Sequence, residues 1–273
     1  MKAAHLFDVQ GLATIVTGAA SGIGLAYAEV MAANGARVTL MDINPGNLRV
    51  EAERLKQLGG DVRVEVVDVT DRAGLRGAFD RTVERYGGLD TVFANAGIDA
   101  GPGFLNPEGQ RNPDGALENV LDEHWDKVIA TNLTSVFTTL QCAARHMKPR
   151  NRGCIIVTTS NAALLNEPIV GTPYMPAKAG AAHLVRQAAL ELARYNIRVN
   201  AIAPGPFVTN IANGRLRNAA DRKAFETTSP QHRVAATDEI KGLALLLASP
   251  LASAYLTGAQ IIIDGGVLLG RAD

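Results

Sequence analysis

The sequence lacks the features that mark secreted, membrane-spanning or nucleic-acid-binding proteins. Its two cysteines, Cys142 and Cys154, are too few for a disulfide framework and have no metal-ligand spacing. Its 27 basic and 27 acidic residues cancel, so no long-range field favours nucleic acid or an anionic membrane. No apolar run approaches the roughly 20 residues of a membrane span, and the one before Asp8 is too short for a signal peptide. We expect a soluble, cytoplasmic protein whose partner is a small molecule.

Histidine is also scarce, and its five copies are scattered without the spacing of a metal site. We therefore expect no bound metal. Basic residues between positions 215 and 222 are interrupted by Asp221, so we interpret them as a solvated helix face and not as a nucleic-acid-binding patch.

Hydrophobic residues make up 47% of the 273-residue chain, which is enough for a sizeable core. Apolar runs of strand length alternate with longer stretches of helical period, as in repeated βαβ units. Strands are predicted over 12–17, 37–41, 62–67, 90–94, 154–159, 199–203 and 260–263. Helices are predicted over 23–34, 47–58, 73–86, 125–146, 173–195 and 238–247. The pattern predicts the α/β class, with one Rossmann-like domain over 1–273 whose doubly wound parallel sheet carries helices on both faces.

Two segments depart from this alternation. Residues 98–123 are rich in glycine and proline among polar residues, which predicts a long loop. Such loops are often functional, but surface decoration explains this one equally well. Residues 207–234 combine helical stretches with mixed polarity, and we assign them to substrate binding.

A glycine-rich turn follows the first strand and opens the first helix. Its sequence, TGAASGIG at 17–24, places Gly18, Gly22 and Gly24 where a backbone has to approach a pyrophosphate closely. The helix that follows would present its amides and its positive dipole end to that charge. Asp42 follows Gly24 by 18 residues, at the end of the second strand. A carboxylate there can accept both ribose hydroxyls of NAD but repels the 2′-phosphate of NADP, so we predict NAD (NADH) as the cofactor.

Two further strand ends fit the same ligand. Asp68 follows the third strand and could accept the adenine amino group, although a helix N-cap explains it equally well. The small residues Asn95, Ala96 and Gly97 follow the fourth strand and leave room for a cofactor at the carboxyl edge of the sheet.

Tyr174 and Lys178 stand four residues apart at the start of a predicted helix, which places them on one face. Free tyrosine titrates near pH 10, so a base working near neutrality needs its phenolate stabilised by roughly 4 kcal/mol. An ammonium about 4 Å away supplies an amount of that order at an effective dielectric of 20. Such a pair also arises often by chance, and by itself it does not decide between a catalytic and a structural role.

Seven signals in order resemble the short-chain dehydrogenase/reductases and cover nearly the whole chain. They are TGAASGIG at 17–24, Asp68-Val69, NAG at 95–97, Asn132, Ser160, YMPAK at 174–178 and PGPFVT at 204–209. The resemblance implies that Tyr174 is the general acid/base and that Lys178 lowers its pKa and holds the nicotinamide ribose. It implies that Ser160 binds the substrate oxygen and that Asn132 organises a water relay. It also implies a homotetramer formed through the helices 125–146 and 173–195 and the last strand.

The resemblance also completes the cofactor site. The implied residues are Gly18, Ser21, Gly22, Ile23, Gly24, Asp42, Asp68, Val69, Asn95, Ala96, Gly97, Tyr174, Lys178, Pro204, Gly205, Phe207, Val208 and Thr209. Ser160 precedes the tyrosine by 14 residues, one more than the family usually has. We assign it because it directly follows a strand, with Thr159 and Asn161 as alternatives.

For the substrate we expect a lipophilic or cyclic secondary alcohol or ketone. The expectation rests on apolar residues after Ser160 and beyond the sixth strand. The predicted contacts are Ser160, Leu165, Ile169, Tyr174 and Phe207. A cis-dihydrodiol or other diol dehydrogenase and a biosynthetic ketoreductase are the alternative enzymes. A non-catalytic NAD sensor or scaffold is the alternative outside the enzymes.

Overall fold

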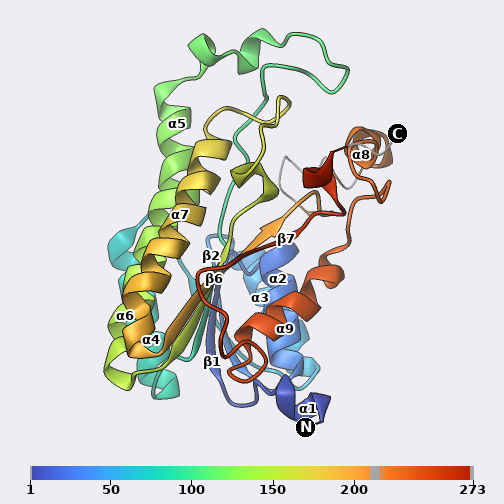
Figure 1. Cartoon of the computed structure of the whole chain (residues 1–273). Helices are drawn as coiled ribbons and strands as arrows, with labels where there is room; N and C mark the ends of the chain where they lie inside the picture. Colours follow the sequence, from blue (N-terminus) through green and yellow to red (C-terminus); the bar gives the residue numbers. More distant parts are fainter. Residues whose placement is uncertain (1, 210–215, 217, 271–273) are drawn as a thin grey trace.

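Seven parallel strands form the centre of the molecule, in the spatial order β3-β2-β1-β4-β5-β6-β7 (Figure 1). The structure is a computed structural model that describes residues 2–209, 216 and 218–270. The strands are β1 (Ala13–Thr17), β2 (Arg37–Asp42), β3 (Asp61–Val66), β4 (Thr91–Ala94), β5 (Gly153–Thr158), β6 (Ile197–Pro204) and β7 (Gln260–Ile263). The predicted α/β class and its doubly wound parallel sheet are confirmed.

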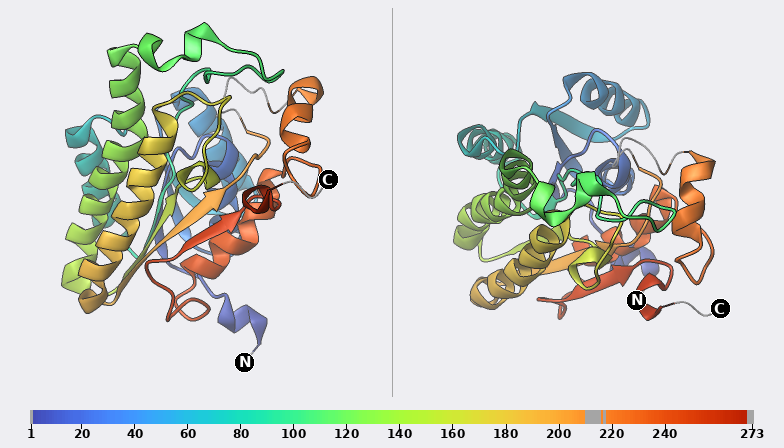
Figure 2. Two further views of the ribbon diagram at one scale, coloured as in Figure 1. Left: turned by 45° about the horizontal axis from the view of Figure 1, so that its top comes forward. Right: turned by 90° about the horizontal axis from the view of Figure 1, so that it is seen from above.

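Helices cover both faces of this sheet. They are α1 (Ala3–Leu6), α2 (Gly22–Ala33), α3 (Pro45–Gln57), α4 (Arg72–Tyr86), α5 (Asp122–Ile129), α6 (Ser135–Met147), α7 (Tyr174–Leu192), α8 (Ala219–Glu226) and α9 (Lys241–Ala248). Helices α2, α3 and α9 pack on one face, and α4, α6 and α7 pack on the other (Figure 2). Every residue of β1 and β4 is buried because both faces of the sheet are covered.

Capping residues explain where several helices begin and end. The side chain of Asn44 accepts hydrogen bonds from the Gly46 and Asn47 amides at the start of α3. Asp71 does the same for α4, and Gly87, at φ 72°, ends that helix in the left-handed conformation. These local signals place α3 and α4 so that they connect β2 to β3 and β3 to β4.

The predicted helix 125–146 differs from the observed one in two ways. The observed helix begins earlier, because α5 starts at Asp122. It also changes to a π-helical turn over Ala130–Thr134 before α6 begins. Such turns occur frequently at functional sites, and this one contains the buried Asn132.

The segment 98–123 lies over the carboxyl edge of the sheet (Figure 2). It contains two 3₁₀ turns, Pro113–Gly115 and Leu117–Asn119, and isolated bridges join Pro102 to Val170 and Leu105 to Arg111. The segment is therefore more structured than the predicted loop.

Of the predicted segment 207–234, positions 210–215 and 217 lie outside the described residues, and α8 belongs to the described part. None of the described helices is both long and apolar enough to span a membrane. Within the described ranges, no three His, Cys, Asp or Glu side chains are grouped as a metal site requires.

Candidate active site

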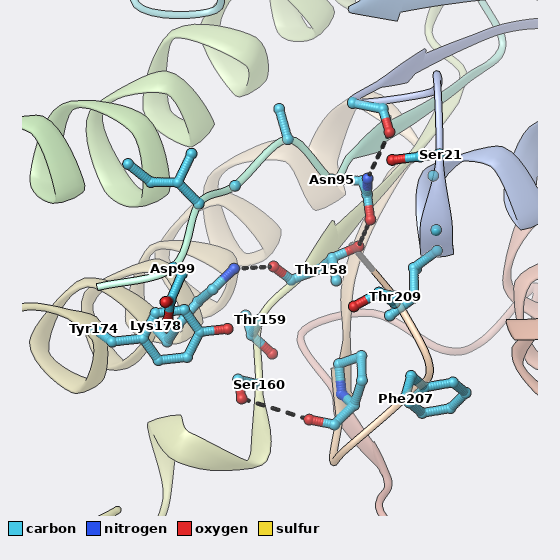
Figure 3. A pocket seen from close by; sticks show the side chains of 18 of the residues that line it. Ser21, Asn95, Asp99, Thr158, Thr159, Ser160, Tyr174, Lys178, Phe207 and Thr209 are labelled. Carbon is cyan, nitrogen blue, oxygen red and sulfur yellow. Dashed lines mark hydrogen bonds between the residues drawn. The ribbon is translucent and has the colours of Figure 1, made fainter. Parts of the chain in front are cut away.

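A cavity of about 600 Å³ opens at the carboxyl edge of the sheet (Figure 3). It lies where the strand order reverses, because β1 pairs with β2 on one side and β4 on the other, and the loops that follow these strands diverge. Its volume is within the range of ligand sites. The predicted site residues on its wall are Gly18, Ser21, Gly22, Ile23, Gly24, Asp42, Asn95, Ala96, Gly97, Ser160, Tyr174, Lys178, Pro204, Gly205, Phe207 and Thr209.

Other predicted residues lie outside this wall. They are Asp68, Val69, Asn132, Leu165, Ile169 and Val208. The Asp68 carboxylate accepts hydrogen bonds from the amide and hydroxyl of Thr70, and the N-cap of α4 is Asp71, so the N-cap interpretation of Asp68 was wrong. Val69 lines a separate cavity. Because Leu165 and Ile169 do not line the cavity, they give no support for a lipophilic substrate.

The glycine turn forms a narrow cradle at one end of the cavity. Gly18 and Gly22 have φ values of 67° and 57°, which residues other than glycine rarely adopt. A Cβ on Gly24 would lie 2.1 Å from the carbonyl oxygen of Gly18, so only glycine lets α2 pack this closely on the turn. The first residues of α2 line the cavity, which places the positive end of the helix dipole where a pyrophosphate can bind.

Asp42, at the end of β2, is held by the backbone on both sides. Its two carboxylate oxygens accept hydrogen bonds from the amides of Ala20 (3.0 Å) and Asn44 (2.9 Å). No lysine or arginine in the described part of the chain forms an ion pair with it. The glycine cradle, the dipole of α2 and the carboxylate of Asp42 together fit a nicotinamide dinucleotide.

A chain of hydrogen bonds fixes the floor of the cavity (Figure 3). The Asn95 amide nitrogen donates to the carbonyl oxygen of Thr17 (3.0 Å), and its amide oxygen accepts from the Thr158 hydroxyl (3.1 Å). The Lys178 ammonium donates to the Thr158 carbonyl oxygen (3.0 Å). Lys178 is only 4% exposed, and this burial lowers its pKa from 10.5 to about 8.

Tyr174 and Lys178 lie next to each other on the cavity wall. The lysine nitrogen lies 5.6 Å from the centre of the Tyr174 ring. The pKa of Tyr174 is raised to about 12, mainly by burial and to a smaller extent by the charge of Asp99, while a hydrogen bond with Ser160 acts in the opposite direction. The side chains of the protein therefore do not by themselves make this phenol a base at neutral pH.

Ser160 is the best placed of the three candidate carbonyl-binding groups. Its hydroxyl lies on the cavity wall, at 3.3 Å from the Asn161 amide oxygen and 3.5 Å from the Pro204 carbonyl oxygen. The Thr159 hydroxyl is held by shorter hydrogen bonds, because it donates to the carbonyl oxygen of Ile202 (3.0 Å) and accepts from the side-chain amide of Gln260 (3.2 Å). Asn161 does not line the cavity.

Asn132 acts on the cavity through the backbone of Ile98. Its amide oxygen accepts from the Ile98 amide (2.8 Å), and its amide nitrogen donates to the Ile98 carbonyl oxygen (2.9 Å). The π-helical turn presents this fully buried side chain to the strand end. A role in a water relay remains a prediction.

The wall also contains residues that the sequence analysis missed. They are Ile98, Asp99, His124, Lys127 and Thr158. Thr159, Pro206 and Leu216 also line the cavity, and the sequence analysis had named them only as an alternative, within the PGPFVT signal and within the segment 207–234, respectively. Asp99 could have been found, because it follows the Asn95-Ala96-Gly97 turn by two positions. His124 and Lys127 carry no such signal, since the path of segment 98–123 brings them to the cavity.

Comparisons with known proteins give consistent matches over almost the whole chain. A family model described as enoyl-(acyl carrier protein) reductase matches residues 18–268. A sorbose reductase from Schizosaccharomyces pombe is 33% identical over 264 residues, which is 96% of this chain and 97% of the relative. The NADPH-dependent 3-quinuclidinone reductase from Rhodotorula rubra is 33% identical, with a TM-score of 0.85 and coverage of 98% and 95%. A 7α-hydroxysteroid dehydrogenase solved with NADH and 7-oxo glycochenodeoxycholic acid is 30% identical, with a TM-score of 0.84 and coverage of 97% and 98%.

Proposed function

Because the chain belongs to the short-chain dehydrogenase/reductase family, we propose that it transfers hydride between NAD(H) and a secondary alcohol or ketone, with Tyr174 as the acid/base. One observation carries this proposal. The hydroxyls of Ser160 and Tyr174 share a cavity with the glycine cradle and Asp42, and Lys178 lies in its floor. The reacting oxygen of the substrate and the nicotinamide dinucleotide would therefore bind in the same cavity.

Bound NAD⁺ supplies the hydride acceptor and a positive charge at the nicotinamide ring. During oxidation, the Ser160 hydroxyl donates a hydrogen bond to the substrate oxygen, and the Tyr174 phenolate takes the hydroxyl proton at its oxygen. Lys178, charged below its pKa of about 8, stabilises that phenolate. Reduction runs in reverse, and Tyr174 then donates the proton to the ketone oxygen.

Asp42 supports NAD(H) over NADP(H). Its carboxylate is fixed at the end of β2 by two backbone amides, and no ion pair with a described residue neutralises it. A 2′-phosphate there would meet an uncompensated like charge, whereas the two ribose hydroxyls of NAD would find an acceptor. The known relatives include users of each cofactor, so the preference is a property of this residue in this chain.

For the substrate we propose a cyclic or lipophilic carbon skeleton. Pro206, Phe207 and Leu216 contribute apolar side chains to the cavity wall. Burying a ring against them is favourable by roughly 25 cal/mol per Å². The related 7α-hydroxysteroid dehydrogenase was solved with a steroid, which is a ligand of this kind.

We also propose a homotetramer in the cytoplasm. Large apolar side chains are exposed on the elements expected at the interfaces: Phe137 on α6 (45%), Leu190 on α7 (78%) and Ile262 on β7 (44%). Both cysteines are buried free thiols, as suits a reducing compartment. Light scattering on the purified protein tests the assembly, and a monomeric mass would contradict it.

The proposed reaction is tested by NADH absorbance with a panel of cyclic, aromatic and aliphatic secondary alcohols. Tyr174→Phe keeps the ring and removes the proton-transferring oxygen, so we expect turnover to fall by about 100-fold or more. The matched control is Tyr255→Phe, because Tyr255 is fully exposed and remote from the cavity wall. Equal activity of the wild type and Tyr174→Phe would reject the assigned role. Binding of NAD without turnover of any alcohol or ketone would favour a non-catalytic role.

A further inference from the structure

One charged side chain in the active-site cavity has no part in the proposed hydride transfer. Asp99 lines the same cavity as Ser160 and Tyr174, and the close view shows it on the Tyr174 side (Figure 3). It is partly buried, and it follows the Asn95-Ala96-Gly97 turn at the end of β4. Because its charge acts on the Tyr174 hydroxyl, Asp99 lies near the place where the reacting oxygen of the substrate would bind.

The backbone on the N-terminal side of Asp99 is held in place. The Asn132 side chain makes two hydrogen bonds with the backbone of Ile98. Its amide oxygen accepts from the Ile98 N–H (2.8 Å), and its amide nitrogen donates to the Ile98 carbonyl oxygen (2.9 Å). Both hydrogen bonds are shielded from solvent, since the Asn132 side chain is fully buried. The residue before Asp99 therefore has little freedom.

The backbone on the C-terminal side is held as firmly. The His124 ring nitrogen Nε2 lies 2.8 Å from the Ala100 carbonyl oxygen, and the Gly171 amide donates to the Gly101 carbonyl oxygen (3.0 Å). A Cβ on Gly171 would lie 1.8 Å from the Ala100 oxygen, so the two segments are in direct contact. The backbone at Asp99 is therefore fixed on both sides, which lowers the entropy cost of binding a ligand there.

The charge of Asp99 opposes the chemistry of its neighbour. It raises the pKa of Tyr174, although the phenol has to lose its proton for alcohol oxidation. A hydrogen-bond donor on the substrate would weaken this opposition, because its dipole offsets part of the field of the carboxylate. An ammonium donor is disfavoured, because the cations Lys127 and Lys178 line the same cavity. A hydroxyl group fits better.

We propose that Asp99 is a specificity-determining residue that accepts a hydrogen bond from a second hydroxyl group of the substrate. The preferred substrate is therefore a diol, oxidised at one carbinol, or the matching hydroxyketone. This inference rests on the proposed function, because it names the substrate class of the same site. The cyclic skeleton would pack on the apolar side chains of the wall, and the second hydroxyl would face Asp99.

The test compares cyclohexanol with 1,2- and 1,3-cyclohexanediols, using NAD and the wild type, Asp99→Ala and Asp99→Asn. A hydrogen bond to a charged group predicts that kcat/KM for the best diol exceeds that for cyclohexanol by about 10- to 100-fold. Asp99→Ala should reduce this ratio about tenfold or more, and Asp99→Asn, which keeps a weaker acceptor, should give an intermediate ratio. Asp114→Asn is the matched control, because Asp114 is an exposed carboxylate of the same segment. Its ratio should equal that of the wild type.

A diol-to-cyclohexanol ratio that does not change in Asp99→Ala would overturn the proposal. This holds whether both activities are retained or both fall by the same factor, as a purely structural role of Asp99 would produce. Circular dichroism shows whether Asp99→Ala is folded. If it is not, the diol-to-cyclohexanol ratio of Asp99→Asn is the deciding measurement.

A binding measurement separates this proposal from the proposed function. Trp125 is the only tryptophan and follows His124 on α5, so its fluorescence reports ligands near this end of the cavity. With NAD present, the diol should bind more tightly than cyclohexanol to Tyr174→Phe, and the difference should vanish when Asp99→Ala is added. If the wild type shows this preference for binding the diol but turns over neither alcohol, the proposed reaction is rejected and the role of Asp99 is retained. Equal binding of both alcohols would reject the role of Asp99.

Discussion

Replacing Lys178 by methionine should abolish activity and change how stability depends on pH. The ammonium is buried, and its pKa is lowered from 10.5 to about 8. Each pKa unit corresponds to about 1.4 kcal/mol, so the charged lysine costs the folded state about 3 kcal/mol at pH 7. Methionine has a similar length and no charge, so the variant avoids this cost. It also loses the hydrogen bond to the Thr158 carbonyl oxygen.

The direction of the pH dependence follows from proton binding. Between pH 8 and 10.5 the unfolded chain holds the lysine proton more tightly than the folded chain, so the stability of the wild type rises with pH in this window. Relative to Lys178→Met, the wild type should gain about 2 kcal/mol in free energy of unfolding between pH 7 and 9.5. Tyr174 has the opposite effect, because its pKa is raised to about 12, but only above pH 10.

Urea unfolding of both proteins at equal concentration, followed by circular dichroism, measures this difference. All other titrating groups are common to the two proteins and cancel. A difference that stays constant from pH 7 to 9.5 would mean that the buried lysine titrates normally. It would then refute the assignment of a costly buried charge.

Three other predictions concern the cofactor site and the core. Gly24→Ala should abolish NAD binding in a dialysis assay, because its Cβ would lie 2.1 Å from the Gly18 oxygen; retained affinity would show that the turn adjusts. Asp42→Ala should lower the NAD-to-NADP ratio of kcat/KM by about tenfold or more, and an unchanged ratio would remove Asp42 from cofactor selection. Cys142 and Cys154 should resist thiol reagents until the protein unfolds, because burial raises the pKa of both thiols; rapid labelling of the native protein would contradict their burial.

The sequence predicted the repeating part of the fold well. The seven strands lie within one or two residues of their predicted positions, because buried parallel strands appear as apolar runs and the helices between them carry caps such as Asp71. The helix 125–146 was the main exception. Its change to a π-helical turn around Asn132 depends on hydrogen bonds to Ile98, a residue 34 positions away.

The cavity was predictable only where its residues follow a local motif. Tyr174 and Lys178, the glycine turn and Asp42 stand at strand or helix ends, and all of them lie on the wall. Leu165 and Ile169 were predicted from their apolar character alone and do not lie on it, because the path of a loop is decided by contacts and not by composition. His124 and Lys127 reach the wall through the course of segment 98–123.

The sequence by itself determined the sheet, the order of its strands along the chain and the chemical groups that the strand ends carry. Local periodicity, glycine conformations and caps are properties of neighbouring residues, so they can be read without a structure. The tertiary structure alone decided that His124 and Lys127 reach the cavity wall and that Lys178 is buried, with a lowered pKa. Position and burial depend on residues far away in the chain, and these set the electrostatics of the site.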